Sequence, residues 1–285
     1  MSFLILIIGF ALLIKGADVF VEGASSIAKK FNVPSMIIGL TIVAMGTSAP
    51  EAAVSVTSSL AGQNDMSVAN VVGSNFFNVL VVLGVSSIIA KLPVQEETIK
   101  KDTPFLILVS ILLLVFGINL KLGRIEGLAL LGLFTYFLVN TIKSAKKATE
   151  DDSLETGETA IAIETQTSSE ISLPKTILVS IVGIVGIVLG GDMVVNSATS
   201  IATSLGMSAN LVGLTIVAVG TSLPEFVTSI VAIKKGETEI AIGNVIGSNL
   251  FNILLVLGLA AVINPISMSM LAFIDIIFMV LITLL

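Results

Sequence analysis

Several chemical groups are absent from this 285-residue chain or scarce in it. The sequence contains no cysteine and no histidine, and only 12% of its residues are charged. Without cysteine there is no disulfide and no thiolate metal site, and no redox compartment can be inferred. Without histidine the chain lacks imidazole ligands and the side chain that most often titrates near neutral pH. The oxygen donors that remain suit Na⁺ and Ca²⁺ better than zinc or copper.

Long apolar runs dominate what is present. Hydrophobic residues make up 55% of the chain, and the runs exceed the roughly 20 residues that a helix needs to cross a bilayer. The first run has no basic segment and no small-residue cleavage site, which indicates a membrane helix and not a signal peptide. We therefore predict an all-α integral membrane protein with about nine spans. They cover residues 3–28, 35–60, 66–90, 104–120, 125–142, 175–203, 208–233, 239–263 and 268–285.

Two segments of the chain occur twice, 174 residues apart. Gly39–Glu51 reads G-L-T-I-V-A-M-G-T-S-A-P-E, and Gly213–Glu225 reads G-L-T-I-V-A-V-G-T-S-L-P-E. Asn70–Gly84 and Asn244–Gly258 match each other at the same offset, and both contain G-S-N-x-x-N. All four segments lie within apolar runs, so the repeat relates two membrane-embedded halves.

The repeat divides the chain into three regions. Residues 1–142 form a first transmembrane repeat of about five helices, and residues 175–285 form a second with about four. The hydrophilic segment 143–174 contains seven acids between positions 150 and 170, a composition typical of a solvated linker and not of a calcium-binding loop. A half-repeat with an odd number of spans implies that the second copy is inverted. The chain ends at Leu285 inside an apolar run, so we expect the tenth helix, the counterpart of the fifth span, to be missing from this chain.

The basic residues predict the orientation in the cell membrane. Loops on one side carry eleven lysines, whereas loops on the other side carry only Lys121 and Arg124. The positive-inside rule makes the lysine-rich side cytoplasmic, which places the 143–174 linker in the cytoplasm and the N-terminus outside. The eleven are Lys29, Lys30, Lys91, Lys100, Lys101, Lys143, Lys146, Lys147, Lys175, Lys234 and Lys235.

The first repeated segment ends in a proline followed by a glutamate at bilayer depth. Because Pro50 has no N–H, we expect the helix to open there and leave the carbonyls of Ala44 and Thr47 without intrahelical partners. Ser48 and Thr47 add hydroxyls, and Glu51 adds a carboxylate. Carboxylates inside a membrane are costly and usually functional. The second copy supplies the same set from Ala218, Thr221, Ser222, Pro224 and Glu225.

The second repeated segment adds amide and hydroxyl oxygens. Ser74 and Asn78 are four residues apart and share a helix face, and Ser248 and Asn252 repeat this face. Two carboxylates balance the charge of one Ca²⁺, and neutral oxygens can complete its six to eight ligands.

A purely structural interpretation competes for some of these residues. Small residues allow membrane helices to touch, and Ser and Asn side chains hydrogen-bond between helices. The helix faces that carry Ser74 with Asn78 and Ser248 with Asn252 could either bind ions or only join helices by hydrogen bonds. We assign the structural role to Asn75, Asn249, Gly39, Gly73, Gly213 and Gly247.

Together these motifs resemble those of the calcium/cation antiporter superfamily, and within it the sodium/calcium exchangers of the short prokaryotic type. The resemblance requires both G-T-S-x-P-E and both G-S-N-x-x-N motifs in order, and it covers nearly the whole chain. It implies two inverted repeats of five helices and a central site that opens alternately to the two sides. The implied function is secondary exchange of Na⁺ for Ca²⁺, without enzymatic activity and without a prosthetic group. The implied partners are Ca²⁺, Na⁺ and the lipid bilayer, with no nucleic acid and no obligate protein partner.

The resemblance also implies a ligand set. In the family, the positions that match this chain bind ions through side chains and backbone carbonyls; they are Glu51, Glu225, Ser48, Ser222, Ser74, Ser248, Asn78, Ala44, Thr47, Ala218 and Thr221. Potassium-dependent relatives carry aspartate at the position of Asn252, which disfavours K⁺ co-transport here. Proton/calcium exchangers usually carry G-N-x-x-E in place of G-T-S-x-P-E, which favours Na⁺ as the driving ion.

Three other functions compete with this hypothesis. A Ca²⁺/H⁺ antiporter would use the same two glutamates as proton carriers. A serine hydrolase would need a base and a G-x-S-x-G elbow, both of which are missing, and a paired-acid hydrolase would leave the Ser, Thr and Asn sets unexplained. A channel could use the same ligands, but inverted repeats with broken helices favour alternating access.

Overall fold

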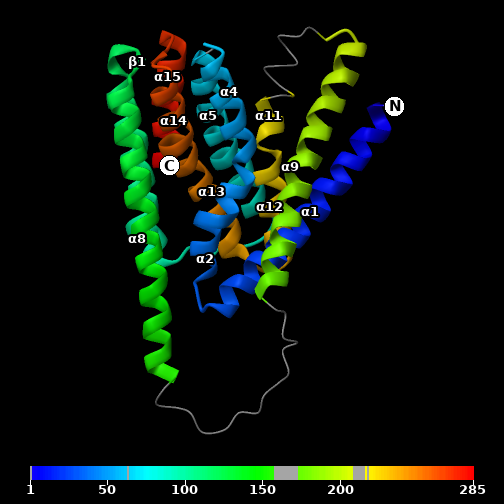
Figure 1. Ribbon diagram of the computed structural model, residues 1–285, viewed down its shortest axis with the longest axis vertical. Coiled ribbons are helices and arrows are strands. Elements are labelled where there is room, and N and C mark those ends of the chain that lie inside the picture. The colour runs from blue at the N-terminus through cyan, green and yellow to red at the C-terminus, as the bar shows by residue number, and fades with distance from the viewer. Residues whose placement is uncertain (1, 63, 157–172, 208–215, 217) are drawn as a thin grey trace.

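Helices form nearly all of the structure, which is a computed structural model that describes residues 2–62, 64–156, 173–207, 216 and 218–285 (Figure 1). In the first half the elements are α1 (Ser2–Lys30), α2 (Ser35–Ile38), η1 (Gly39–Val43), α3 (Ala44–Thr47), α4 (Ala49–Leu60), α5 (Asn64–Phe77), η2 (Asn78–Leu83), α6 (Gly84–Ile89), η3 (Thr98–Asp102), α7 (Thr103–Phe116), η4 (Gly117–Asn119), β1 (Lys121–Leu122) and α8 (Arg124–Thr156). In the second half they are α9 (Leu173–Ser204), α11 (Ala218–Thr221), α12 (Leu223–Lys234), α13 (Thr238–Phe251), η6 (Asn252–Leu257), α14 (Gly258–Ile263), β2 (Ile266–Ser267) and α15 (Met270–Leu284).

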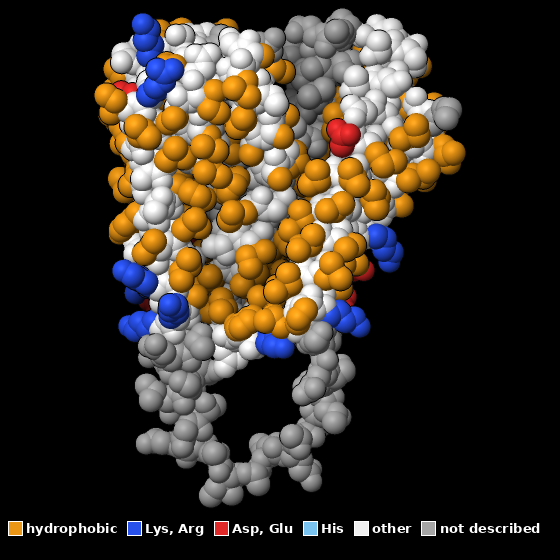
Figure 2. Space-filling view, in the orientation of Figure 1, with side chains coloured by type: hydrophobic (Ala, Val, Ile, Leu, Met, Phe, Trp, Pro, Cys, Tyr) orange, Lys and Arg blue, Asp and Glu red, His pale blue; other side chains and the backbone are white. Residues whose placement is uncertain are grey.

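The described residues contain six unbroken helical segments that are long and apolar enough to cross a membrane. A seventh candidate is the pair Ser35–Thr47 and Ala49–Leu60, which is bent by 48°. The shorter apolar helix Met270–Leu284 coincides with the ninth predicted span. The predicted span 208–233 falls partly outside the described residues, so the count of nine stays a prediction. Figure 2 shows the apolar surface expected of such a protein, with Lys and Arg side chains gathered near its lower edge.

The linker is one place where the structure differs from the predicted boundaries. Helix α8 continues to Thr156, well beyond the predicted end of the fifth span at residue 142. The residues after the predicted span include Lys and Glu, which favour the helix in water although their charges exclude them from the bilayer. The helix therefore continues beyond the membrane boundary. Residues 157–172 lie outside the described residues.

Helix α13 forms the centre of the bundle. Every residue from Ile240 to Phe251 is buried, as expected for a helix that is surrounded by other helices on all sides. In Figure 1, α13 lies with α4, α5 and α12 between α8 on one side and α1 and α9 on the other. The four segments that carry the repeated motifs are thereby brought together.

Helices α1 and α9 lie against each other because glycines let their backbones approach closely. A Cβ atom added at Gly190 would lie 2.4 Å from the backbone nitrogen of Leu13, and one added at Gly183 would lie 2.7 Å from that of Phe20. Contacts this short leave no room for a side chain, which is how small residues drive helix pairing in membranes.

The four glycines interpreted as helix contacts have different outcomes. A Cβ at Gly39 would lie 2.7 Å from the carbonyl oxygen of Ile240, and one at Gly247 would lie 2.4 Å from that of Leu40. Both are close contacts between η1 and α13, so the interpretation is confirmed for them. No described atom lies within 4 Å of a Cβ built at Gly73. In the 174-residue repeat, the counterpart of the Gly247–Leu40 contact would join Gly73 to Leu214, which lies outside the described residues, so the interpretation of Gly73 stays a prediction. Gly213 lies outside the described residues.

The α1–α9 contact generates a stability prediction. Gly190→Ala should lower the melting temperature in detergent by several degrees, because the added methyl group forces two backbones apart at a cost of about 1–3 kcal/mol. Gly132→Ala in α8 is the matched control, since no described atom lies within 4 Å of its added Cβ. Equal melting temperatures for the two variants would contradict the close packing.

Candidate ion-binding site

Both copies of the G-T-S-x-P-E motif break their helix at the serine. Ser48 lies between α3 and α4 with φ −84° and ψ 8°, and Ser222 lies between α11 and α12 with φ −91° and ψ 4°. Proline occupies the first turn of each following helix, where its missing N–H costs nothing. The predicted break is therefore present in both halves.

One detail of the predicted break is wrong. The Ala44 carbonyl was expected to lack an intrahelical partner, but it accepts a hydrogen bond from the Ser48 backbone nitrogen at 3.0 Å. It also accepts one from the Thr47 hydroxyl at 3.4 Å. The helix opens at Ser48 and not one turn earlier, because a proline removes only its own donor and the preceding N–H groups still find acceptors.

Two buried glutamates lie at the centre of the site. Glu51 and Glu225 both have 0% exposed surface. Each carboxylate accepts a hydrogen bond from the serine of the other half: Ser48 Oγ lies 2.8 Å from Glu225 Oε1, and Ser222 Oγ lies 3.3 Å from Glu51 Oε1. Ser74 Oγ, from α5, donates to the same Glu51 oxygen at 3.3 Å. These five predicted residues therefore form two hydrogen-bonded groups, each of which joins the two halves of the chain.

Two asparagines that sequence reasoning did not single out hold these helices in place. Asn70 and Asn244 each donate to the backbone carbonyl of the glutamate in their own half and to a serine one turn further on. Both open the second repeated segment, so the repeat itself was the signal that could have identified them. The bonds run from Asn70 Nδ2 to Glu51 O (3.2 Å) and Ser55 Oγ (2.9 Å), and from Asn244 Nδ2 to Glu225 O (3.3 Å) and Ser229 Oγ (3.0 Å).

The two threonines of the motif donate to these same asparagines across the halves. Thr47 Oγ1 lies 3.0 Å from Asn244 Oδ1, and Thr221 Oγ1 lies 3.5 Å from Asn70 Oδ1. The Thr47 hydroxyl also bonds to the Val43 carbonyl at 3.1 Å. Its hydroxyl therefore positions the neighbouring helix, and the role of Thr47 as an ion ligand stays a prediction.

Four further asparagines form a second hydrogen-bonded group between α5 and α13. Asn78 Nδ2 donates to Asn249 Oδ1 at 3.1 Å, and Asn252 Nδ2 donates to Asn75 Oδ1 at 3.1 Å. The structural role predicted for Asn75 and Asn249 thus includes orienting the two candidate ligands. The π-helical turns η2 and η6 begin at Asn78 and Asn252, and such turns are frequent at functional sites.

Several buried oxygens at this site have no hydrogen-bond partner among the described residues. All of them can accept a bond or coordinate a cation, and leaving them unpaired is costly unless a partner is supplied. No ion pair between described residues involves either glutamate. The donor set is therefore anionic and oxygen-only, which fits a hard cation such as Ca²⁺ or Na⁺. The unpaired atoms are Glu51 Oε2, Glu225 Oε2, Asn78 Oδ1, Asn252 Oδ1 and Ser248 Oγ.

One predicted ligand position is only partly described. Ala218 begins helix α11, and its side chain lies outside the described residues. The role of its carbonyl, like that of the Ala44, Thr47 and Thr221 carbonyls, stays a prediction.

Comparison with known proteins identifies the family. The sequence profile of the sodium/calcium exchanger protein family matches residues 1–143 and 175–285. The putative antiporter CaxA of Alkalimonas amylolytica is 44% identical over 263 residues, which cover 91% of this chain and 80% of the relative. The sodium/calcium exchanger MaX1 of Methanosarcina acetivorans is 33% identical over 296 residues, covering 94% of this chain and 85% of the relative.

A solved structure of the sodium-calcium exchanger NCX_Mj has the same fold. It matches this chain with a TM-score of 0.85 at 30% identity, covering 99% of this chain and 88% of the other. The family profile includes both helix breaks, both buried glutamates and all six asparagines described above. The chain therefore belongs to the sodium/calcium exchanger family of membrane antiporters.

Proposed function

We propose that the protein exchanges Na⁺ for Ca²⁺ across the cell membrane by alternating access of the site around Glu51 and Glu225. The observation that carries this proposal is the pair of fully buried carboxylates, each with one oxygen bonded to a serine of the other half and one unpaired. Two formal negative charges balance one Ca²⁺. The serine and asparagine oxygens around them supply neutral ligands.

Exchange follows from sharing these ligands. Na⁺ ions can occupy the same region through the carboxylates, hydroxyls and amides, so neither ion is bound well while the other is present. If both carboxylates are charged and no cation is bound, the change from one open side to the other costs energy, because the low-dielectric interior does not compensate their charge. One ion therefore replaces the other before the site reopens on the opposite side.

The membrane arrangement is part of the proposal. It comprises nine spans in two inverted repeats, the N-terminus outside and the 143–174 linker in the cytoplasm. The distribution of lysines supports the orientation. Hydrogen bonds that recur at an offset of 174 residues, such as Asn70–Glu51 and Asn244–Glu225, support the repeat. Inverted repeats with ligands on broken helices are typical of secondary transporters.

The alternative function is Ca²⁺/H⁺ exchange by the same two glutamates. A buried carboxylate without a cationic partner can carry a proton as well as a metal ion. The two functions differ in which gradient drives Ca²⁺ movement.

The first experiment imposes gradients on proteoliposomes that contain the purified protein. An outward Na⁺ gradient should drive ⁴⁵Ca²⁺ uptake, and a pH gradient should not replace it. K⁺ should not be required, because the residues at positions 78 and 252 are both asparagine. Protein-free vesicles provide the control for leakage. Uptake driven by protons in the absence of Na⁺ would reject Na⁺ exchange and support the alternative.

The second prediction concerns the carboxylates. Glu51→Gln and Glu225→Gln should each abolish Ca²⁺ uptake, because one remaining carboxylate leaves a divalent ion undercompensated where screening is poor. Glu96→Gln is a control, since Glu96 is exposed and pairs with Lys100 on the surface. Uptake near the wild-type rate in either single variant, at equal expression, would contradict the site.

The third prediction concerns an asparagine that orients a ligand. Asn249→Ala removes the acceptor of the Asn78 amide, so the Asn78 oxygen should lose its orientation and the apparent Ca²⁺ affinity should fall roughly tenfold. Asn264→Ala is the matched control, because Asn264 bonds to the Ser59 carbonyl outside the site. If the two variants alter thermal stability alike and neither alters Ca²⁺ affinity, Asn249 has no orienting role.

A further inference from the structure

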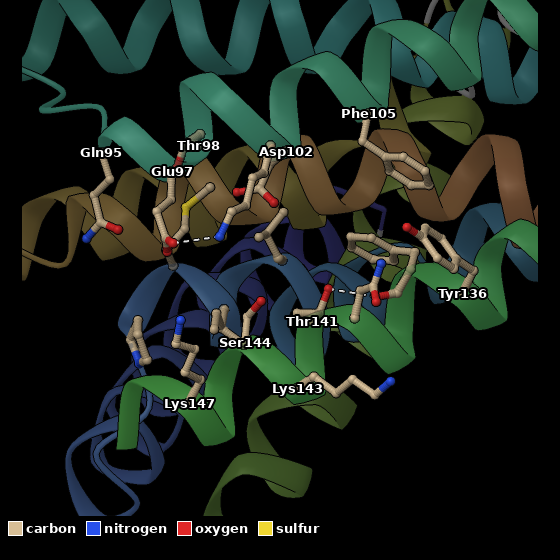
Figure 3. Close-up of a pocket in the computed structure, with 17 residues that line it drawn as sticks. Gln95, Glu97, Thr98, Asp102, Phe105, Tyr136, Thr141, Lys143, Ser144 and Lys147 are labelled. Atoms are coloured by element: carbon tan, nitrogen blue, oxygen red, sulfur yellow. Dashed lines mark hydrogen bonds and ion pairs between the residues drawn. The ribbon is translucent and has the colours of Figure 1, made fainter. Parts of the chain in front are cut away.

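A polar cavity of about 500 Å³ lies apart from the ion site, between α2, α7 and α8. Its wall on α8 carries Ser144 and Lys147, and its opposite wall on η3 carries Lys101 and Asp102. Phe105 and Tyr136 close its deeper end (Figure 3). These residues lie at the lysine-rich edge of the apolar surface, which corresponds to the depth of lipid head groups.

The charges in this cavity are not fully paired. Lys101 pairs with Glu97 at 2.7 Å. The other two lining lysines, Lys143 and Lys147, have no ion-pair partner among the described residues, and neither does Asp102. In Figure 3, Lys147 and Ser144 point from α8 toward the wall that carries Glu97 and Asp102. The side chain of Lys143 runs along α8 and away from that wall. The cavity thus presents the ammonium group of Lys147 on one side and the carboxylate of Asp102 on the other.

An apolar groove adjoins this cavity. It has a volume of about 690 Å³, and it shares Ile37 and Thr141 with the polar cavity. Its other walls include Phe31, Ile42 and Met45, which are 46%, 38% and 42% exposed. These side chains face the outer surface of the helices, where lipid tails are the surrounding solvent. The polar cavity and the groove together have the amphipathic character of a phospholipid.

We propose that the cavity binds the head group of a phospholipid that carries a primary amine. Lys147 contacts the phosphate, Asp102 accepts hydrogen bonds from the ammonium group, and an acyl chain lies in the groove beside α2. Basic pockets between helix ends are known to hold phosphate head groups. Asp102 decides the type of lipid, because a carboxylate disfavours a head group with a net negative charge and favours one with a donor amine.

A lipid explains the site better than free phosphate. Inorganic phosphate would use Lys147 but would leave the groove and Asp102 without a partner. The bound lipid would also contact Ile37 and Leu40. These residues precede the helix break at Ser48 by about two turns or more, so the lipid stabilises the start of the segment that carries the ion ligands.

Binding can be measured without any transport assay. Delipidated protein is titrated with phosphatidylethanolamine, phosphatidylglycerol and phosphatidylcholine of identical acyl chains, and bound lipid is counted by native mass spectrometry. Phosphatidylethanolamine should bind roughly tenfold more tightly than phosphatidylcholine, whose quaternary amine cannot donate a hydrogen bond to Asp102. Inorganic phosphate at the same concentration should neither compete nor raise the melting temperature.

Two variants separate the contributions of the charges. Lys147→Gln should lower the binding affinity for all three lipids roughly fivefold. Asp102→Asn should remove the difference in affinity between phosphatidylethanolamine and phosphatidylglycerol. Lys100→Gln is the matched control, because Lys100 neighbours Lys101 but pairs with Glu96 and does not line the cavity. Equal affinities of the wild type for the three lipids, an unchanged preference in Asp102→Asn, or competition by inorganic phosphate would overturn the proposal. None of these outcomes bears on the ion site.

Discussion

The burial of two carboxylates without a basic partner is the constraint on which the rest of this structure depends. Glu51 and Glu225 are fully buried, and no described lysine or arginine pairs with them. A charge in such a place must be met by hydrogen bonds and by a cation. One oxygen of each glutamate accepts a hydrogen bond from a serine hydroxyl of the opposite half of the chain. The other oxygen of each glutamate has no hydrogen-bond partner among the described residues, and the proposed exchange uses these unpaired atoms to bind the ion.

Both helix breaks and two of the π-helical turns supply a donor or a candidate ligand to this arrangement. The break at Ser48 turns its hydroxyl toward Glu225, and the break at Ser222 does the same for Glu51. The π-helical turns η2 and η6 begin at Asn78 and Asn252, the residues whose amide oxygens are unpaired among the described residues. Irregular backbone inside a membrane is tolerated only where protein, water or ions satisfy it. These four deviations from regular helix therefore occur next to the candidate ligands.

The sequence allowed the spans, the helix breaks and both glutamates to be predicted, because hydropathy, proline and a buried charge act locally. It did not reveal that the hydroxyl of Thr47 bonds to Asn244, since that contact joins residues 197 apart and depends on how the halves dock. The extension of α8 to Thr156 escaped prediction because hydropathy reports the membrane boundary and not the end of a helix.

The two copies of the motif have the same ligands but different surroundings. Helix α13 is buried from Ile240 to Phe251, whereas the side chain of Met66 on α5 is 49% exposed. Ion chemistry requires the same oxygens from each half, and this requirement accounts for the identity of the motifs. Packing within the bundle requires different neighbours, since one copy lies at its centre and the other beside it. The site is therefore symmetric in its donors and asymmetric in the burial of the helices that hold them.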